Sequence, residues 1–370
     1  MWKRSFVAYL VFAWVPLAAL PAEATFPGEN GRIAFRRFLN VDMTWGAVFT
    51  IKPDGSGERQ ITHPPRGYVD RNPDVSPNGR RITFEREGVD CGPDCIYDEV
   101  FVVNADGSHL TKLTHNPQGE VCGSGGFCNG SPAWSPDGRR IAFNRASGPV
   151  DDEAVGIYVM NTDGSGVQQI TQTARPALGE DSDPQWSPNG RKIVFQRRNV
   201  RTATPRGGIA LWTVNLVSGR ERRVTPWHLR AGDTPDWSPD GRRILFHDNL
   251  DGPSDVSANL YTIRPNGSHL QQLTFEEGGV VNYLGSSYSP DGTMITFGRR
   301  PATGGTAADV FVMRVDGTQK VTRTELYDSY PDWGPRPPFL TRTRAAGNGR
   351  DGASREGPPQ ATTSRASRAS

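Results

Sequence analysis

The stretch Pro132-Ala-Trp-Ser-Pro-Asp-Gly-Arg-Arg-Ile-Ala-Phe143 is the part of this sequence that decides the fold. Its centre has the composition of a tight turn. Proline presets φ at the first central position, aspartate suits the second, and glycine takes the positive φ that lets the chain return. After the turn, Ile141 and Phe143 alternate with other residues at the period of a half-buried strand. The stretch therefore predicts a strand, a turn and a second strand.

The same unit recurs along the chain. Further copies begin at Pro73, Pro184, Pro235 and, with a degenerate start, Ser286. The turn prolines are spaced 59, 52, 51 and 51 residues apart, and they are Pro77, Pro136, Pro188, Pro239 and Pro290. Self-similarity at a nearly fixed period of this length is the signature of a repeat architecture.

Each copy is followed by a second hairpin. One example starts Ile157-Tyr-Val-Met-Asn-Thr-Asp-Gly164 and continues to Thr171. Asp-Gly and Asn-Gly turns of this kind are those that two-stranded hairpins prefer. Each repeat therefore predicts four antiparallel strands, which is one blade of a β-propeller.

The two ends of the repeat region complete each other. The first part contains Gly31–Phe35 and Val48–Thr62, three strands that lack an innermost one, and the last part supplies Tyr330–Pro335. Joining them closes a ring and removes open sheet edges. The sequence thus predicts an all-β, six-bladed propeller of four-stranded antiparallel blades over residues 25–335, closed by a composite blade from both termini. An open array of hairpins is the rival, but its short strands would share no core.

The glycine and proline content agrees with a fold that has many turns, and the net charge is too small to produce a strong electrostatic field. The chain has 42 glycines and 30 prolines in 370 residues, and a formal net charge of +2. A balance so close to neutral does not favour nucleic acid as a partner. We expect a monomer that binds no nucleic acid.

Residues 1–24 have the pattern of a secretory signal peptide. Lys3 and Arg4 precede an apolar stretch, and Ala22-Glu-Ala24 is a small-x-small cleavage site. The alternative is an uncleaved anchor, but the apolar stretch is short for a span and is interrupted by Pro16. We expect an exported protein, periplasmic or extracellular, with no membrane span after cleavage.

Residues 336–370 differ from the repeat region in composition. They contain seven arginines and two acids, a net charge of +5 (7 − 2), among many small and polar residues. Such a segment cannot bury enough apolar surface to offset its ordering entropy. We expect a disordered basic tail.

The sequence contains no recognisable catalytic set. There is no Gly-x-Ser-x-Gly elbow and no His-Glu-x-x-His, and the six histidines are scattered. The prediction is a protein that is not an enzyme.

Polar residues at one position of the repeat form the candidate site. They lie three residues before the strand proline, or one residue later in the fourth copy, and are Asp70, Asn129, Asp181, Asp233 and Asp328. Repeat symmetry places them near one mouth of the central channel, where carboxylates could bind a cation such as calcium or a basic peptide group. The alternative is that each one caps its own turn. Asp74, Asp236 and Asp332, just after the proline, extend the same acidic lining. We predict no other cofactor.

The long irregular loops fall on one face, which we call the loop-rich face. They connect the second and third strands of each repeat, or successive repeats, and binding on a rigid scaffold usually occupies such loops. Four cysteines lie in two of them: Cys91, Cys95, Cys122 and Cys128. An even count in an exported chain favours disulfides. We favour Cys91–Cys95 and Cys122–Cys128, while pairing between the loops and a zinc site stay as alternatives.

The repeat unit, with its Ile-Tyr-Val-Met-Asn-x-Asp-Gly and Gln-Gln-Ile-Thr segments, resembles the WD-like repeat of the TolB-like propellers. The resemblance covers about residues 31–335 and implies fold rather than activity. It implies a place in the cell envelope and protein partners there. We therefore expect a non-enzymatic binding or scaffold propeller that recognises a protein, peptide or glycan through its loop-rich face. The alternative is a metal-dependent hydrolase that uses acids at the channel mouth.

Overall fold

A computed structural model describes most of the repeat region. It covers residues 28–89, 98–115, 127–147, 155–171, 180–199, 208–232, 234–248, 259–275, 281–301, 308–318, 321–322 and 328–338. The chain divides into two units, Met1–Pro337 and Pro338–Ser370, and nearly all described residues belong to the first. The predicted signal peptide and all but the first residues of the predicted tail lie outside the described residues. Within the described part, no helix has the length and apolarity that a membrane span requires.

Among the described residues, four sheets have four antiparallel strands each. Their strands are β8 (Phe127–Trp134), β9 (Arg140–Ser147), β10 (Gly156–Asn161), β11 (Gln168–Gln169); β12 (Asp181–Trp186), β13 (Lys192–Asn199), β14 (Gly208–Asn215), β15 (Glu221–Arg223); β16 (Asp236–Trp237), β17 (Ile244–His247), β18 (Leu260–Ile263), β19 (Gln271–Gln272); β20 (Val281–Tyr288), β21 (Met294–Pro301), β22 (Asp309–Arg314) and β23 (Val321–Thr322). A short 3-10 helix, η2 (Trp227–Leu229), stands between β15 and β16.

A fifth sheet has eight strands. They are β24 (Asp328–Pro335), β1 (Asn30–Phe38), β2 (Gly46–Ile51), β3 (Arg59–Gln60), β4 (Tyr68–Val75), β5 (Arg81–Gly88), β6 (Glu99–Asn104) and β7 (Thr111–Lys112). Seven follow the order β24-β1-β2-β4-β5-β6-β7, and β3 pairs with β2. The sheet consists of two antiparallel groups of four, joined by the parallel pair Gly46 and Val69.

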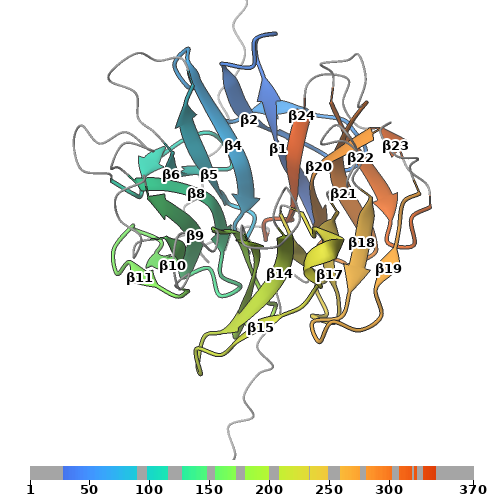
Figure 1. Ribbon diagram of the computed structural model, residues 1–370. Helices are drawn as coiled ribbons and strands as arrows, with labels where there is room; N and C mark the ends of the chain where they lie inside the picture. The colour runs from blue at the N-terminus through green and yellow to red at the C-terminus, as the bar shows by residue number, and fades with distance from the viewer. Residues whose placement is uncertain are drawn as a thin grey trace, which may run out of the picture. The chain divides into compact units, whose positions relative to one another are not determined.

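The innermost strands contact one another in a closed cycle. The order is β24, β4, β8, β12, β16, β20 and back to β24. Figure 1 shows the strand groups following one another around a common centre, in a propeller-like arrangement. The all-β, propeller-like arrangement of four-stranded sheets predicted from the repeat is therefore confirmed.

The turn of the repeat has the chemistry that its sequence predicts. Gly138 adopts φ +65°, and its N–H donates to the Ser135 carbonyl at 2.8 Å. The Ser135 hydroxyl donates to Asp137 at 2.6 Å, and the same carboxylate accepts the Arg139 N–H at 3.0 Å. The aspartate thus satisfies the backbone of its own turn, which explains its recurrence.

The core lies between successive sheets rather than within one. The second strand of each group of four, counted from the innermost strand, contributes a phenylalanine that is fully buried: Phe35, Phe84, Phe143, Phe195, Phe246 and Phe297. In one junction, Val100 and Leu113 of one sheet pack with Trp134 and Phe143 of the next. Each sheet therefore needs its neighbour to bury its apolar face.

The two ends of the repeat region meet in one sheet, as the sequence predicts. β24 pairs antiparallel with β1, with Ile33 opposite Trp333 and Arg37 opposite Asp328. Trp333 is 3% exposed and packs against Ile33 and Phe35. The last innermost strand therefore completes a sheet whose other strands come from the start of the chain.

We predict that Trp333→Ala destabilises the protein by about 3–5 kcal/mol, because it removes a large buried ring that the surroundings cannot replace. Urea unfolding followed by circular dichroism measures this loss. Val217→Ala is the control, since Val217 is 87% exposed. Equal stability of the two variants would contradict the closure of the sheet by β24.

Candidate functional site

Each innermost strand has one residue with a left-handed backbone at the same repeat position. The six residues are Asn72 (φ 50°), Ser131 (46°), Asp183 (52°), Thr234 (51°), Gly285 (76°) and Tyr330 (52°). All but Gly285 carry a side chain. In β4, β8, β12 and β20 the pairing register shifts at this position, as in a β-bulge.

This repeated conformation costs free energy, and it changes the direction in which the neighbouring side chains point. A left-handed residue other than glycine costs about 1–3 kcal/mol, and it persists only where the surrounding structure imposes it. A bulge bends the strand and changes the direction of the side chains beside it. Here the bulges lie where the innermost strands enter the channel, so the residues after them line its centre.

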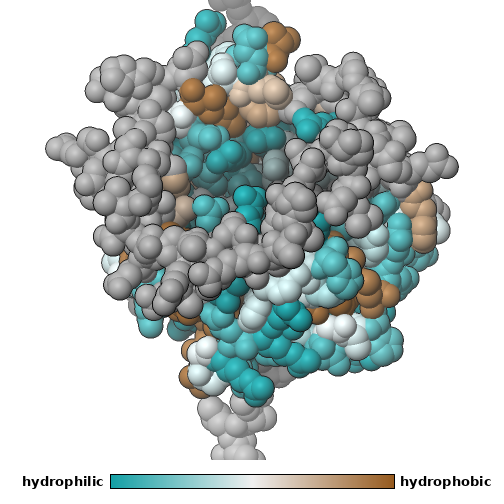
Figure 2. Space-filling view, viewed as in Figure 1, coloured by the Kyte–Doolittle hydropathy of each residue, from teal (hydrophilic) through white to brown (hydrophobic). Residues whose placement is uncertain are grey.

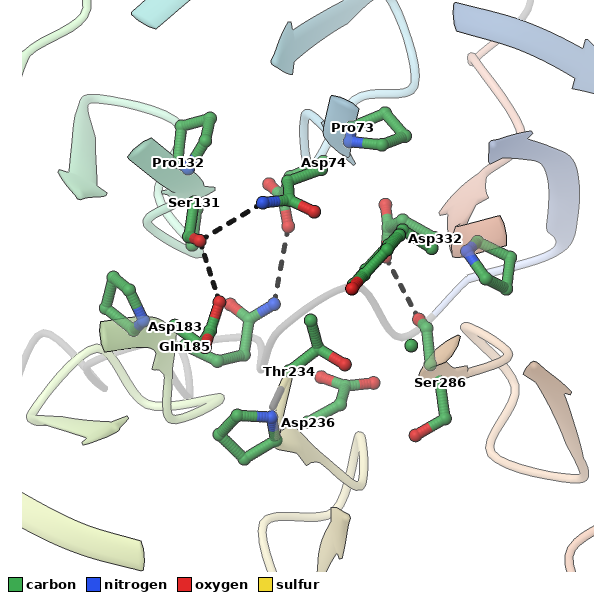
Figure 3. Close-up of a pocket in the computed structure, with 18 residues that line it drawn as sticks. Pro73, Asp74, Ser131, Pro132, Asp183, Gln185, Thr234, Asp236, Ser286 and Asp332 are labelled. Carbon is green, nitrogen blue, oxygen red and sulfur yellow. Dashed lines mark hydrogen bonds between the residues drawn. The ribbon is translucent and has the colours of Figure 1, made fainter. Parts of the chain in front are cut away.

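A small cavity of about 70 Å³ lies among these strands. We call it the channel cavity. Figure 3 shows Asp74, Asp236 and Asp332 around it, from β4, β16 and β24, with Gln185 beside Asp74. The Gln185 amide donates to Asp74 at 3.3 Å, and the Ser287 hydroxyl donates to Asp332 at 3.0 Å.

The three carboxylates also tie neighbouring innermost strands together. Asp74 accepts the Trp134 N–H at 2.8 Å. Asp236 accepts the Tyr288 N–H at 2.7 Å, and Asp332 accepts the Val75 N–H at 2.7 Å. Each carboxylate therefore has one oxygen engaged by the next strand around the channel.

Burial changes the protonation of this group. Loss of solvation raises the pKa of Asp236 to about 7, with a further contribution from the charge of Asp332. Burial raises the pKa of Asp332 to about 6. Burial and the nearby charge of Asp332 hold the pKa of Asp74 well above its ordinary value. The cavity thus gains negative charge as the pH rises through the neutral range.

Three buried oxygens at the cavity have no hydrogen-bond partner within the described part of the chain. They are Asn72 Oδ1, Thr234 Oγ1 and Ser286 Oγ. Ser286 is only 4% exposed. Buried polar atoms are normally satisfied, so these oxygens favour a ligand that donates hydrogen bonds.

A wider cavity of about 270 Å³ adjoins the channel cavity, and we call it the channel mouth. The two share Asn72, Ser131, Asp183 and Tyr330. The mouth is also lined by residues in the second half of second strands (Glu85, Asn144, Gln196), the half from which the chain leads on to the third strands. It therefore opens on the predicted loop-rich face. Figure 2 shows hydrophilic side chains in a hollow near the centre of the viewed face.

Acids outnumber bases along this passage. The two cavities are lined by seven acids, Asp74, Glu85, Asp98, Glu180, Asp183, Asp236 and Asp332, and by two arginines, Arg71 and Arg198. Arg71 pairs with Glu85 at 2.6 Å and Glu87 at 2.8 Å. Burial and the charge of Glu85 raise the pKa of Asp98 to about 7. The passage therefore suits a cationic group.

The residues predicted as ligands occupy a different environment. Asp70, Asn129, Asp181 and Asp328 are at most 2% exposed, and none is among the residues that line the two cavities. Three of them face an arginine of a neighbouring strand through two hydrogen bonds, as in Asp70 with Arg86 at 2.6 and 2.8 Å. Asn129 accepts one from Arg145 at 2.9 Å. The geometry gives these residues internal partners, and their role as ligands stays a prediction.

Each arginine partner also contacts an aromatic ring of the third strand. The Arg86 guanidinium lies 4.8 Å from the Phe101 ring centre, and that of Arg197 lies 4.8 Å from the Trp212 ring centre. The preceding sheet adds a hydroxyl, since Thr171 donates to Asp181 at 2.7 Å. The aspartate therefore links its own sheet to the sheet before it.

The remaining predicted residues are only partly described. Asp233, Cys91, Cys95 and Cys122 lie outside the described residues. Cys128 is disulfide-bonded, and its pairing stays a prediction. Among the described residues, no three His, Cys, Asp or Glu side chains are grouped so that they could hold a metal ion. Calcium at the mouth therefore stays an untested prediction.

Two features of the site were not predicted from the sequence. The first is the arginine partner, which the recurring Phe-x-Arg of the second strand signals, as in Phe84-Glu-Arg86 and Phe195-Gln-Arg197. Side chains two apart share a face of a strand. The second is the left-handed residue before the proline. Asparagine and aspartate adopt positive φ more often than other residues that are not glycine, so Asn72 and Asp183 gave a weak signal, whereas Tyr330 gave none.

Comparison with known proteins supports the fold. No family model matches this chain. TolB of the Tol-Pal system from Zymomonas mobilis is 42% identical over 83 residues, which are 22% of this chain and 16% of that protein. An uncharacterized peptidase, YuxL, from Bacillus subtilis is 23% identical over 216 residues, which are 50% of this chain and 30% of that protein. The chain thus spans less than a third of either relative.

Solved structures give the same result over most of the chain. TolB from Acinetobacter baumannii has a TM-score of 0.59 at 18% identity, with 84% of this chain and 68% of that chain covered. A putative TolB from Agrobacterium tumefaciens has a TM-score of 0.57 at 19% identity, with 81% and 91% covered. The class defined by the fold is a β-propeller. Together with the repeat, these matches support a TolB-like β-propeller fold.

We predict that Asp236 makes stability fall as the pH rises. Its folded pKa of about 7 lies above its ordinary 3.8, so between these values the folded state holds a proton that the unfolded state has released. The stability difference between the wild-type protein and Asp236→Asn should therefore shift against the wild type from pH 5 to pH 8. Urea unfolding at both values measures it.

Asp240→Asn is the matched control for this measurement. The pKa of Asp240, which accepts from Ser238 and the Arg242 N–H, is lowered. Its contribution is therefore lost only below pH 3.8, and it should not change between pH 5 and pH 8. A pH-independent difference for Asp236→Asn would contradict the raised pKa.

Proposed function

We propose that this chain is an exported six-bladed propeller that binds a protein or peptide partner by admitting a cationic group of that partner through the loop-rich face. The blade count takes the eight-stranded sheet as two blades, in line with its two antiparallel groups of four. Export rests on the pattern of residues 1–24 and on the TolB likeness of the fold.

One observation carries the proposal. The channel cavity combines three carboxylates with three buried oxygens that lack a partner in the described part of the chain. An ammonium or guanidinium group donates several hydrogen bonds and carries the complementary charge. A lysine or arginine side chain therefore suits the cavity better than a neutral or anionic group does.

The size of the cavities indicates how such a group would enter. The channel cavity of about 70 Å³ holds only the end of a side chain, while the mouth of about 270 Å³ can hold the rest of a residue. The surrounding face would then supply the larger contact area that a stable complex needs. The proposal is thus a binding propeller rather than an enzyme. The metal-dependent hydrolase stays the alternative, with no observation that favours it.

Titration with short peptides tests the proposal. Ac-Gly-Lys-Gly-NH2 should bind saturably to the mature protein at pH 8. The norleucine peptide, which keeps the four-carbon chain but lacks the terminal ammonium, should bind at least about tenfold more weakly. Binding of the lysine peptide should weaken at pH 5, since Asp236 and Asp332 are then protonated. Calorimetry measures all three.

A double variant gives the control. Asp236→Asn with Asp332→Asn keeps acceptors for the Tyr288 and Val75 N–H groups, so the fold should persist while lysine binding is lost. Asp240→Asn should leave binding unchanged. Equal affinity of the lysine and norleucine peptides, or full affinity in the double variant, would contradict the proposal.

A further inference from the structure

One repeat position fills the junction between successive sheets. It is the residue just before the repeat turn or its equivalent, and it is aromatic in five of six cases: Trp134, Trp186, Trp237, Tyr288, Trp333 and, as the exception, Val75. All six are buried. The junction between β1–β3 and β4–β7 therefore lacks the ring that the other junctions have.

In two filled junctions an arginine of the preceding sheet lies over that ring. The Arg81 guanidinium is 4.6 Å from the Trp134 ring centre, and that of Arg140 is 4.8 Å from the Trp186 ring centre. Both arginines start the second strand of their sheet. Such contacts between a cation and a π face are favourable.

Arg32 holds the corresponding position at the Val75 junction, since it precedes Ile33 as Arg81 precedes Ile82. It has no ring there, and its guanidinium instead donates to the Thr50 hydroxyl at 2.9 Å and to the Thr50 carbonyl at 3.0 Å. A cavity of about 470 Å³ lies at this junction, lined by Arg32, Val75, Ile82 and Pro335. We call it the Val75 groove.

A second cavity supports the link between the missing tryptophan and the groove. It has a volume of about 530 Å³ and lies at the junction of Tyr288, the other position without tryptophan. Its lining residues Arg243 and Thr262 hold the repeat positions of Arg32 and Thr50. Both cavities thus lie where the repeat departs from its usual indole.

The two grooves differ in charge. The Val75 groove is lined by Arg32, Arg59 and Arg80 against one acid, Asp106. Burial and the charge of Arg59 lower the pKa of Arg32, so Arg32 and Arg59 repel one another. The groove at Tyr288 has Asp240 and Asp291 against Arg243. Only the Val75 groove therefore suits an anionic ligand.

The Val75 groove is separate from the channel mouth. Gly79 and Arg80, which line it, belong to the turn before β5, whereas Glu85, the fifth residue of β5, lines the mouth. The groove thus lies toward the opposite ends of the strands. A ligand there would leave the channel cavity accessible.

We propose that the Val75 groove binds an aromatic side chain flanked by carboxylates, from an acidic segment of a partner protein. The ring takes the place under Arg32 that tryptophan takes under Arg81 and Arg140, against the apolar floor of Val75, Ile82 and Pro335. The flanking carboxylates pair with Arg59 and Arg80. This site is independent of the cationic site proposed above.

Three tripeptides test the two parts of this recognition. Ac-Asp-Trp-Asp-NH2 should bind saturably, with chemical shift changes for Val75 and Ile82 methyl groups. Ac-Asn-Trp-Asn-NH2 tests the charge, and Ac-Asp-Ala-Asp-NH2 tests the ring. Each should bind about tenfold more weakly, through loss of two exposed ion pairs or of ring burial. Equal binding of all three would overturn the proposal.

Variants distinguish binding in the Val75 groove from nonspecific attraction of an acidic peptide to surface arginines. Arg59→Ala with Arg80→Ala should weaken Ac-Asp-Trp-Asp-NH2 about tenfold, while Arg139→Ala, at the matching turn position of the filled Trp134 junction, should not. Val75→Trp should abolish binding. Gly334 lies against Val75, so a tryptophan there could disturb folding, and the melting transition shows whether the variant folds. If it does not fold, the variants of the exposed Arg59 and Arg80 decide the test. Unchanged binding in the double variant would overturn the proposal.

Discussion

A buried carboxylate facing a guanidinium fixes the start of the innermost strand in three places: Asp70 with Arg86, Asp181 with Arg197, and Asp328 with Arg37. Neither charge can be left alone without a large desolvation cost, so each requires the other. The arginine also rests on an aromatic ring of the third strand, which ties three strands together. In the last pair the bond joins β24 to β1, and hence the two ends of the repeat region.

The chemistry of the channel depends on these fixed strand starts. Two residues after Asp70 or Asp181 the backbone turns left-handed, and two residues later the side chain lines the cavity. Asp74 and Asp332 line the same cavity, and the charge of Asp332 helps to raise the pKa of Asp74. The raised pKa values of the channel carboxylates are therefore a consequence of how tightly the ring of strands is packed.

The repeat made most of the fold predictable, but it did not make the site predictable to the same degree. The conformation of a tight turn such as Ser135–Gly138 is determined by the turn residues themselves, so it can be predicted from the local sequence. Whether Asp70 faces solvent or Arg86 depends on strand pairing, and only the alternation of Phe84 and Arg86 hinted at it. The sequence shows that Val75 stands where most repeats have tryptophan. It does not show the groove, because the groove depends on how Arg32 is placed when no tryptophan ring lies beneath it.

A double-mutant cycle on Asp70 and Arg86 tests the central claim most directly, because it measures the pair that holds the innermost strand. Asp70→Ala alone should cost about 3–5 kcal/mol of unfolding free energy, since it leaves Arg86 buried without its partner. The double variant should cost clearly less than the sum of the two single changes. Additive and small effects, each under about 1 kcal/mol, would contradict the account and return Asp70 to the role of a ligand.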